Sequence, residues 1–142
     1  MRYARSVRWL LVLGLCAACD GRDAKPAPIK HVDRLDERDR GELIQIAGRA
    51  SEITARMVRG STGPAHIRFQ LALEHDGRTL TVVTKDVVPD LFREGVDVEV
   101  VGRWVHTADV RDALDKEGFE DVRGNDVLLA REIRVAPIKF QF

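Results

Sequence analysis

The stretch that decides the fold is VVPDLFREGVDVEVVG, residues 87–102. Its first half gathers a proline, two bulky apolar residues and a glycine, a composition that favours a compact turn. Its second half alternates strictly, which predicts a half-buried strand, with Val96, Val98 and Val100 on one face and Asp97 and Glu99 on the other. The chain therefore enters an amphipathic strand directly from a short apolar turn.

Four other segments have patterns typical of β-strands. The first contains Gly48, a residue type that often marks a bulge or sharp bend in a strand. The pair Asp76-Gly77 predicts a hairpin between the second and third strands. Short strands, a curved first one and only a compact turn between the third and fourth predict an all-β, five-stranded OB-fold-like barrel, although periodicity alone equally allows a small sandwich. The strands are expected at residues 43–58, 66–74, 79–84, 96–106 and 127–135.

The first 19 residues have the pattern of an export signal. Three arginines precede the apolar run WLLVLGLCAA (9–18), which is too short to cross a bilayer as a helix. LCAACD (15–20) resembles a bacterial lipobox, which implies that Cys19 is lipidated and becomes the mature N-terminus; ordinary cleavage near Ala18 is the alternative. With Cys16 removed and Cys19 acylated, the mature chain has no free thiol for a disulfide or a zinc–thiolate site.

Two charged segments are expected to be solvated. Residues 20–42 combine a proline-containing spacer with mixed charge, so we expect a flexible stalk and a folded domain over 43–142. Residues 107–126 hold seven acidic and three basic residues between the last two strands. The first half of that insertion spaces Val110 and Leu114 as on a helix face, and Gly118 is expected to end the helix.

Composition argues against several classes of function. The 23 basic and 23 acidic residues give a net charge of zero, so no nucleic acid partner is expected. The insertion lacks the alternating ligands and closing glutamate of an EF-hand, and we expect no metal site. No paired catalytic carboxylates, nucleophile–base pair or phosphate-binding glycine loop stands out, so we do not expect an enzyme.

Along these strands the chain resembles the cytochrome c maturation protein E (CcmE) family, membrane-tethered periplasmic haem chaperones. In that family an OB-type barrel carries a turn reading close to LPDLFREG, and Pro89–Gly95 matches it residue for residue, with Val88 in place of leucine. IQIAGRA (44–50) and LLAREI (128–133) resemble its first strand and the strand that leads towards its haem-binding segment. The resemblance covers about half of the chain and implies an OB-type barrel that handles haem. In such a barrel we expect Leu91 and Phe92 of the turn to plug one end, with Gly95 permitting the chain to re-enter the sheet.

One departure from the family concerns the covalent step. The family bonds a haem vinyl group through a histidine soon after the last strand, and Pro137 stands at about that position here. Proline has no imidazole, so any haem is expected to bind non-covalently. We expect the haem surface to include Phe140 and Phe142, which alternate near the C-terminus, with His106 as a conceivable axial ligand because it follows Trp104 on the same strand face. The tail could instead pack on the barrel as an extra strand.

Three functions follow as hypotheses. The first is a CcmE-like factor of cytochrome c biogenesis that works with the maturation machinery or haem lyase components. The second is an OB-fold lipoprotein that has lost haem and binds a protein partner, and the third is binding of an oligonucleotide or saccharide. The lipobox places the chain on the periplasmic side of the bacterial inner membrane; Asp20 after the cysteine resembles the inner-membrane retention signal of enteric bacteria.

Overall fold

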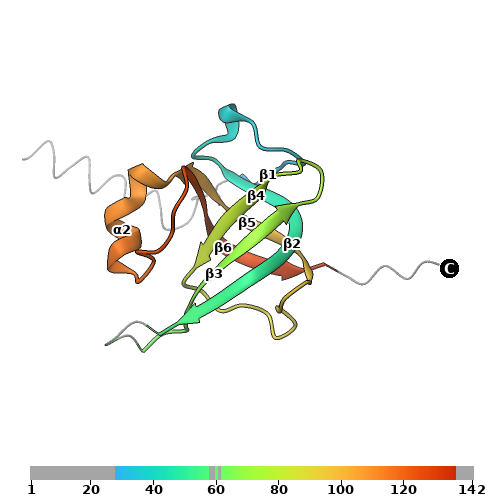
Figure 1. Cartoon of the computed structure of the whole chain (residues 1–142). Helices are drawn as coiled ribbons and strands as arrows, with labels where there is room; N and C mark the ends of the chain where they lie inside the picture. Colours follow the sequence, from blue (N-terminus) through green and yellow to red (C-terminus); the bar gives the residue numbers. More distant parts are fainter. Residues whose placement is uncertain (1–27, 58–59, 61, 137–142) are drawn as a thin grey trace, which may run out of the picture.

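The computed structural model describes residues 28–57, 60 and 62–136. Within them, five strands close a barrel, and a two-residue strand, β1 (Lys30–His31), lies beside the first of them (Figure 1). The sheet order is β1-β2-β3-β4-β6-β5, and pairing of β2 with β5 closes the barrel. The barrel strands are β2 (Leu43–Arg56), β3 (His66–Leu73), β4 (Thr79–Thr84), β5 (Asp97–His106) and β6 (Asp126–Val135).

This topology confirms the predicted all-β, OB-fold-like barrel and excludes the sandwich. Successive barrel strands pair antiparallel, except that β4 and β6 run parallel through only two residue pairs, Val82↔Leu128 and Val83↔Leu129. A closed sheet leaves few unpaired edges, which is how OB-folds protect a small barrel. The predicted strand bounds agree with the structure to within about two residues.

Alternating side chains fill the barrel interior. Each strand directs every second residue inward, as its burial pattern shows. The largest fully buried residues include Trp104 and Phe69. Gly48 and Gly102 allow backbones to approach closely, because a Cβ at Gly48 would lie 2.6 Å from the carbonyl oxygen of Ala72, and one at Gly102 would lie 2.4 Å from that of Leu129.

The prediction that the folded domain starts near Leu43 is wrong, because the chain packs on the barrel from Lys30 onwards. β1 pairs in parallel with β2, and the short 3-10 helix η1 (Glu37–Asp39) follows. Leu35 belongs to the main core, and Asp76 of the β3–β4 hairpin accepts a hydrogen bond from its backbone nitrogen at 2.7 Å. The buried Asp39 carboxylate pairs with Lys30. Leu35, half-buried Val32 and long-range polar contacts anchor a segment whose composition suggests a stalk.

The expectation of a solvated insertion after β5 is also wrong. It forms a 3-10 turn, η2 (Thr107–Val110), and a helix, α2 (Arg111–Lys116), and Gly118 after the helix has a φ of 86°. These elements lie against the outside of the barrel (Figure 1). A second hydrophobic core holds them there, made of Val83, Leu114, Phe119, Val122 and Val127.

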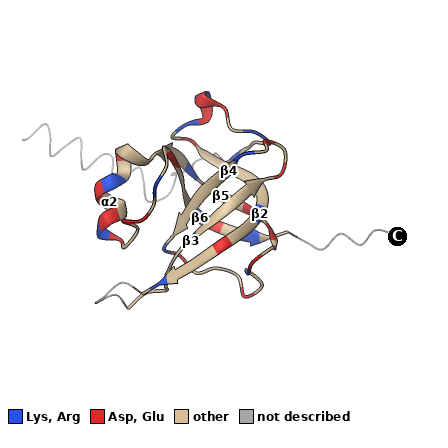
Figure 2. Ribbon diagram, viewed as in Figure 1, with Lys and Arg blue, Asp and Glu red and all other residues tan. Residues whose placement is uncertain are grey.

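Charged residues fasten the same insertion to neighbouring strands. Acidic residues of the insertion form ion pairs with basic residues of β2 and β3 and with Lys85 just after β4, so the barrel neutralises much of the insertion's excess acidity. Figure 2 marks the acidic and basic positions on α2 and on the neighbouring strands. The contacts outside the α2 helix itself are Arg56–Glu120 at 3.2 Å, Arg68–Asp121 at 2.6 Å and Lys85–Glu117 at 2.6 Å.

Candidate functional site

The turn between β4 and β5 closes one end of the barrel with a single aromatic side chain. Phe92 packs against the main core, and its ring meets the edge of Phe69 at a centroid distance of 4.9 Å and an interplanar angle of 64°. Its neighbour Leu91 points outward and is 66% exposed. The sequence suggests that both residues plug the barrel, and this is wrong for Leu91.

Glu94, the acidic residue before the glycine of this turn, binds the irregular part of β2. β2 has an irregularity between Ser51 and Thr54, where Glu52 adopts a φ of 52°, uncommon for a residue other than glycine. The Glu94 carboxylate accepts hydrogen bonds from the backbone nitrogens of Glu52 at 3.0 Å and Ile53 at 2.6 Å. It thereby satisfies two amides that the irregular strand leaves without ladder partners. The turn therefore fixes the bend of the first barrel strand.

Backbone contacts complete this connection. Gly95, with a φ of 79°, donates from its nitrogen to the carbonyl oxygen of Ala50 at 2.8 Å. Ala50 in turn donates to the carbonyl oxygen of Val96 at 3.0 Å. A left-handed residue at this point costs little only when it is glycine. The PDLFREG stretch thus serves as a structural clamp.

The same barrel end presents apolar surface to solvent. Val87 is 81% exposed and Leu91 66% exposed, and both belong to the turn. β6 finishes at this end too, because Val135 pairs with Val98 and Ala136 donates to the carbonyl oxygen of Asp97. Half-buried Val88, Val96 and Val135 pack against the core beside them. We call the turn and the end of β6 together the turn end of the barrel.

Two predicted haem residues, Phe140 and Phe142, and the predicted lipidation site, Cys19, lie outside the described residues. They remain predictions. The chain leaves β6 at the turn end, and Phe140 follows Val135 by five residues, so it can lie at most about 18 Å from it.

His106 lies at the other end of β5. Eight residue steps separate it from Val98, the partner of Val135, which corresponds to about 26 Å along a strand. Its ring is half exposed, with Nδ1 3.6 Å from a carboxylate oxygen of Asp126. The described residues therefore do not bring His106 to the turn end, and one surface made of His106 and the tail is not formed by the barrel.

The surroundings of His106 are polar and strongly paired. Arg40 lies over the Trp104 ring at 4.0 Å and binds Glu37 through two nitrogens and Asp126 through a third at 2.7 Å. Hydrogen bonding to Glu37, and then to Asp126, raises the pKa of Arg40, and the same bond to Arg40 lowers the pKa of Glu37. Trp104 is thus covered by Arg40 and offers no aromatic face beside His106.

The other histidines are also placed by the structure. His66 contacts the carbonyl oxygen of Glu117 through Nδ1 at 2.6 Å and stacks on Phe119 at 5.7 Å, so it fastens the insertion to the barrel. His31 lies on β1 and His75 in the β3–β4 hairpin, and both are exposed. In the described part of the chain, no group of three or more His, Cys, Asp or Glu side chains is arranged to hold a metal ion. Across the same residues, no helix is long and apolar enough to span a membrane.

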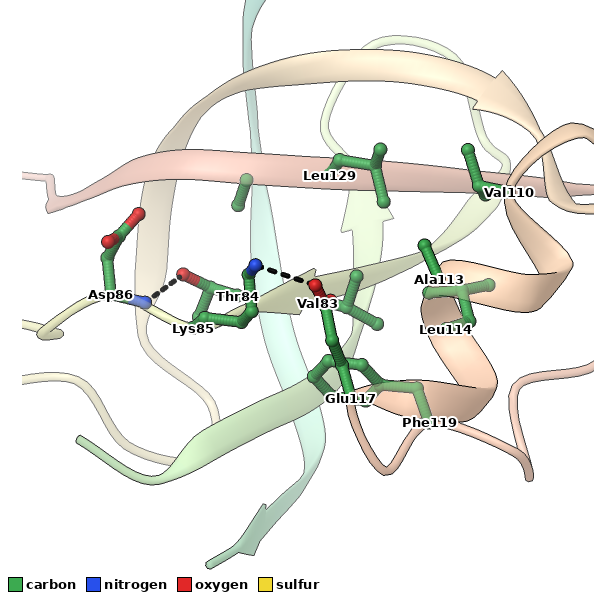
Figure 3. A pocket seen from close by; sticks show the side chains of 11 residues that line it. Val83, Thr84, Lys85, Asp86, Val110, Ala113, Leu114, Glu117, Phe119 and Leu129 are labelled. Carbon is green, nitrogen blue, oxygen red and sulfur yellow. Dashed lines mark hydrogen bonds and ion pairs between the residues drawn. The ribbon is translucent and has the colours of Figure 1, made fainter. Parts of the chain in front are cut away.

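A pocket that the sequence does not predict lies between α2 and the barrel (Figure 3). Its volume is about 180 Å³. Buried Val83, Leu114 and Phe119 form its apolar floor, and the Lys85–Glu117 ion pair crosses its edge. The helical spacing of Val110 and Leu114 is the signal in the sequence that indicates an inward face here, but it does not indicate that space remains beneath it.

Comparisons with known proteins do not identify the family of this chain. No protein-family model and no curated protein matches the chain. Among solved structures, it is similar to the ZRD-deleted mutant of TiaS, crystallised in complex with agmatine, with 20% identity and a TM-score of 0.36 over 53% of this chain. The match covers 21% of that protein, and a likeness of this size carries no argument about function. The resemblance to the CcmE family therefore stays a prediction drawn from the turn and strand residues.

Proposed function

We propose that the chain is a CcmE-like protein of cytochrome c biogenesis, tethered to the periplasmic side of the inner membrane, that holds or delivers haem non-covalently at the turn end of the barrel. The observation that carries the proposal is the exposure of Val87 and Leu91 on the turn that resembles the family's. Exposed apolar side chains gathered at one end of a small barrel are typical of a binding surface. In the sequence, Phe140 and Phe142 come five and seven positions after Val135, the last residue of the strand that ends there.

The expected affinity is modest. One porphyrin face covers a few hundred Å² of apolar surface, and at about 25 cal/mol per Å² this stabilises the complex by several kcal/mol before the costs of association. The dissociation constant is therefore expected around micromolar. His106 does not tighten it, because it lies at the opposite end of β5.

Two measurements test the proposal together. A native haem titration of the mature chain, followed by absorbance, is expected to saturate. A haem-stained denaturing gel, after expression with the cytochrome c maturation genes, is expected to show no haem on the polypeptide, because Pro137 cannot form the bond. Haem that survives the gel contradicts non-covalent handling, and a flat titration contradicts haem handling altogether.

A second candidate function is docking of a protein partner at the turn end without haem. The observation that favours it is the distance of about 26 Å between His106 and the turn end, which leaves that surface without this imidazole as an iron ligand. A flat haem titration together with retained binding to a cytochrome c maturation component would support this alternative.

The fold limits how far the barrel can lie from a lipid anchor at Cys19. Because the chain packs on the barrel from Lys30, only 11 residue steps connect it to Cys19, which span at most about 40 Å. A barrel on an acylated Cys19 would therefore stay close to the membrane surface. The Cys19→Ser variant is expected to appear in the soluble periplasmic fraction or to remain unprocessed. Fractionation and migration like the wild-type protein would contradict lipidation.

A further inference from the structure

The pocket between α2 and the barrel is a preorganised space and not a gap left by loose packing. The second core fixes the insertion, and contacts outside the pocket, from His66 and Arg68, hold its far side. Val83 of β4 and Leu129 of β6 are paired in the sheet, so the barrel wall beneath the pocket is held by strand pairing as well. Packed side chains and paired strands therefore support the pocket on both sides.

Its size and lining suit one compact apolar group. An engineered apolar cavity of about 150 Å³ binds benzene, and this pocket has about 180 Å³. Two α2 side chains border the space, the buried Leu114 of the floor and Ala113, which is small and exposed (Figure 3). A larger residue there would occupy the space, so the identity of residue 113 keeps it open.

The edge of the pocket carries excess negative charge. Lys85 is neutralised by Glu117 at 2.6 Å. Asp86, the next residue along the edge, is exposed, and its carboxylate has no ion-pair partner among the described residues. Among the lining residues, Asp86 and Glu117 are acidic and Lys85 alone is basic. A ligand that fits both the floor and the edge is apolar at one end and cationic at the other.

We propose that this pocket binds a small amphipathic amine, with one aromatic ring or a branched alkyl group against Val83, Leu114 and Phe119 and its ammonium group near Asp86. Asp86 precedes Val87, so the pocket borders the turn end, but its apolar floor lies beneath α2 and amine binding there does not depend on the function proposed for the turn end. A ligand with about nine heavy atoms and one surface ion pair binds in the millimolar range. Binding of that strength is measurable by NMR.

The test is a titration of the mature chain with 2-phenylethylamine, followed by backbone amide shifts. Saturable shifts are expected at Val83, Leu129 and the residues of α2. The anion 3-phenylpropionate, of similar size, is expected to bind more weakly. Absence of saturable shifts at the pocket, or equal binding of the anion, would overturn the proposal.

Two variants separate the contributions of shape and charge. Ala113→Leu is expected to weaken amine binding at least tenfold, whereas Lys116→Leu, exposed on the same helix and not part of the pocket, leaves it unchanged. Asp86→Asn is expected to weaken binding about two- to fivefold, and Asp112→Asn, exposed on α2 and outside the pocket lining, to leave it unchanged. Unchanged binding by Ala113→Leu, in a variant with a wild-type amide spectrum elsewhere, would place the ligand outside the pocket and overturn the assignment.

Discussion

The turn between β4 and β5 and the insertion between β5 and β6 relate to the barrel in opposite ways. The turn resembles a family motif closely, yet it contributes only half-buried side chains to the core and otherwise holds the barrel through Glu94 and backbone hydrogen bonds. The insertion looks like solvated chain, yet it buries Leu114, Phe119 and Val122. The number of apolar residues in a connection therefore does not indicate whether the connection packs on the barrel. A few apolar residues at suitable spacing are enough to hold the insertion, whereas of the adjacent Leu91 and Phe92 in the turn one faces solvent and the other the core.

Of the variants that compare the turn with the insertion, Phe119→Ala is expected to lower the unfolding free energy most. The ring is 3% exposed and contacts His66, so its loss is expected to cost about 3–5 kcal/mol of unfolding free energy. Chemical denaturation followed by circular dichroism measures the cost. Val87→Ala, at an 81% exposed position, is the control and should change stability by less than about 0.5 kcal/mol. Equal stability of the two variants would show that the insertion is not part of the core.

Phe92→Ala tests the turn in the same way and should cost less. Because this ring is only partly buried, we expect a loss of about 2 kcal/mol, roughly half the value for a fully buried phenylalanine. Leu91→Ala, one residue away and 66% exposed, is the matched control and should be close to neutral. A larger loss of unfolding free energy for Leu91→Ala than for Phe92→Ala would show that Leu91, and not Phe92, faces the core.

Glu94→Ala should have the smallest effect of the three on stability. It removes a charged acceptor from the amides of Glu52 and Ile53, at an exposed site, so about 1–2 kcal/mol is expected. Asp90→Ala, an exposed acidic residue of the same turn, is the control. Faster hydrogen exchange at Glu52 and Ile53 should accompany the loss in Glu94→Ala alone. Unchanged exchange there would contradict the clamp.

The barrel could be predicted from sequence because its strands repeat a local signal. Alternating apolar residues in β3 to β6 report the inward face directly, and the Asp76-Gly77 hairpin fixes the pairing of β3 with β4. The segment before Leu43 could not be predicted, since it depends on Leu35 and on the pairing of Lys30 with Asp39, contacts that have no period.

The candidate sites were less predictable for a related physical reason. Nothing in the order Leu91-Phe92 indicates which side chain enters the barrel, because a turn has no repeating face. The sequence also places His106 near Trp104, but it does not show that Arg40, from a distant segment, covers the ring. The pocket beside α2 depends on the size of Ala113 relative to a space that three elements define together.

The central claim is that haem binds at the turn end. Comparing the haem affinities of the Leu91→Ser and Met57→Ser variants tests this claim most directly. Both replace exposed apolar side chains, but Leu91 lies at the turn end and Met57 follows β2 at the start of the β2–β3 connection. If haem binds at the turn end, Leu91→Ser should raise the dissociation constant about tenfold, since covering a leucine contributes roughly 1.5 kcal/mol or more, and Met57→Ser should leave it unchanged. Equal affinities for the two variants, or no haem binding by the wild-type chain, would contradict the account.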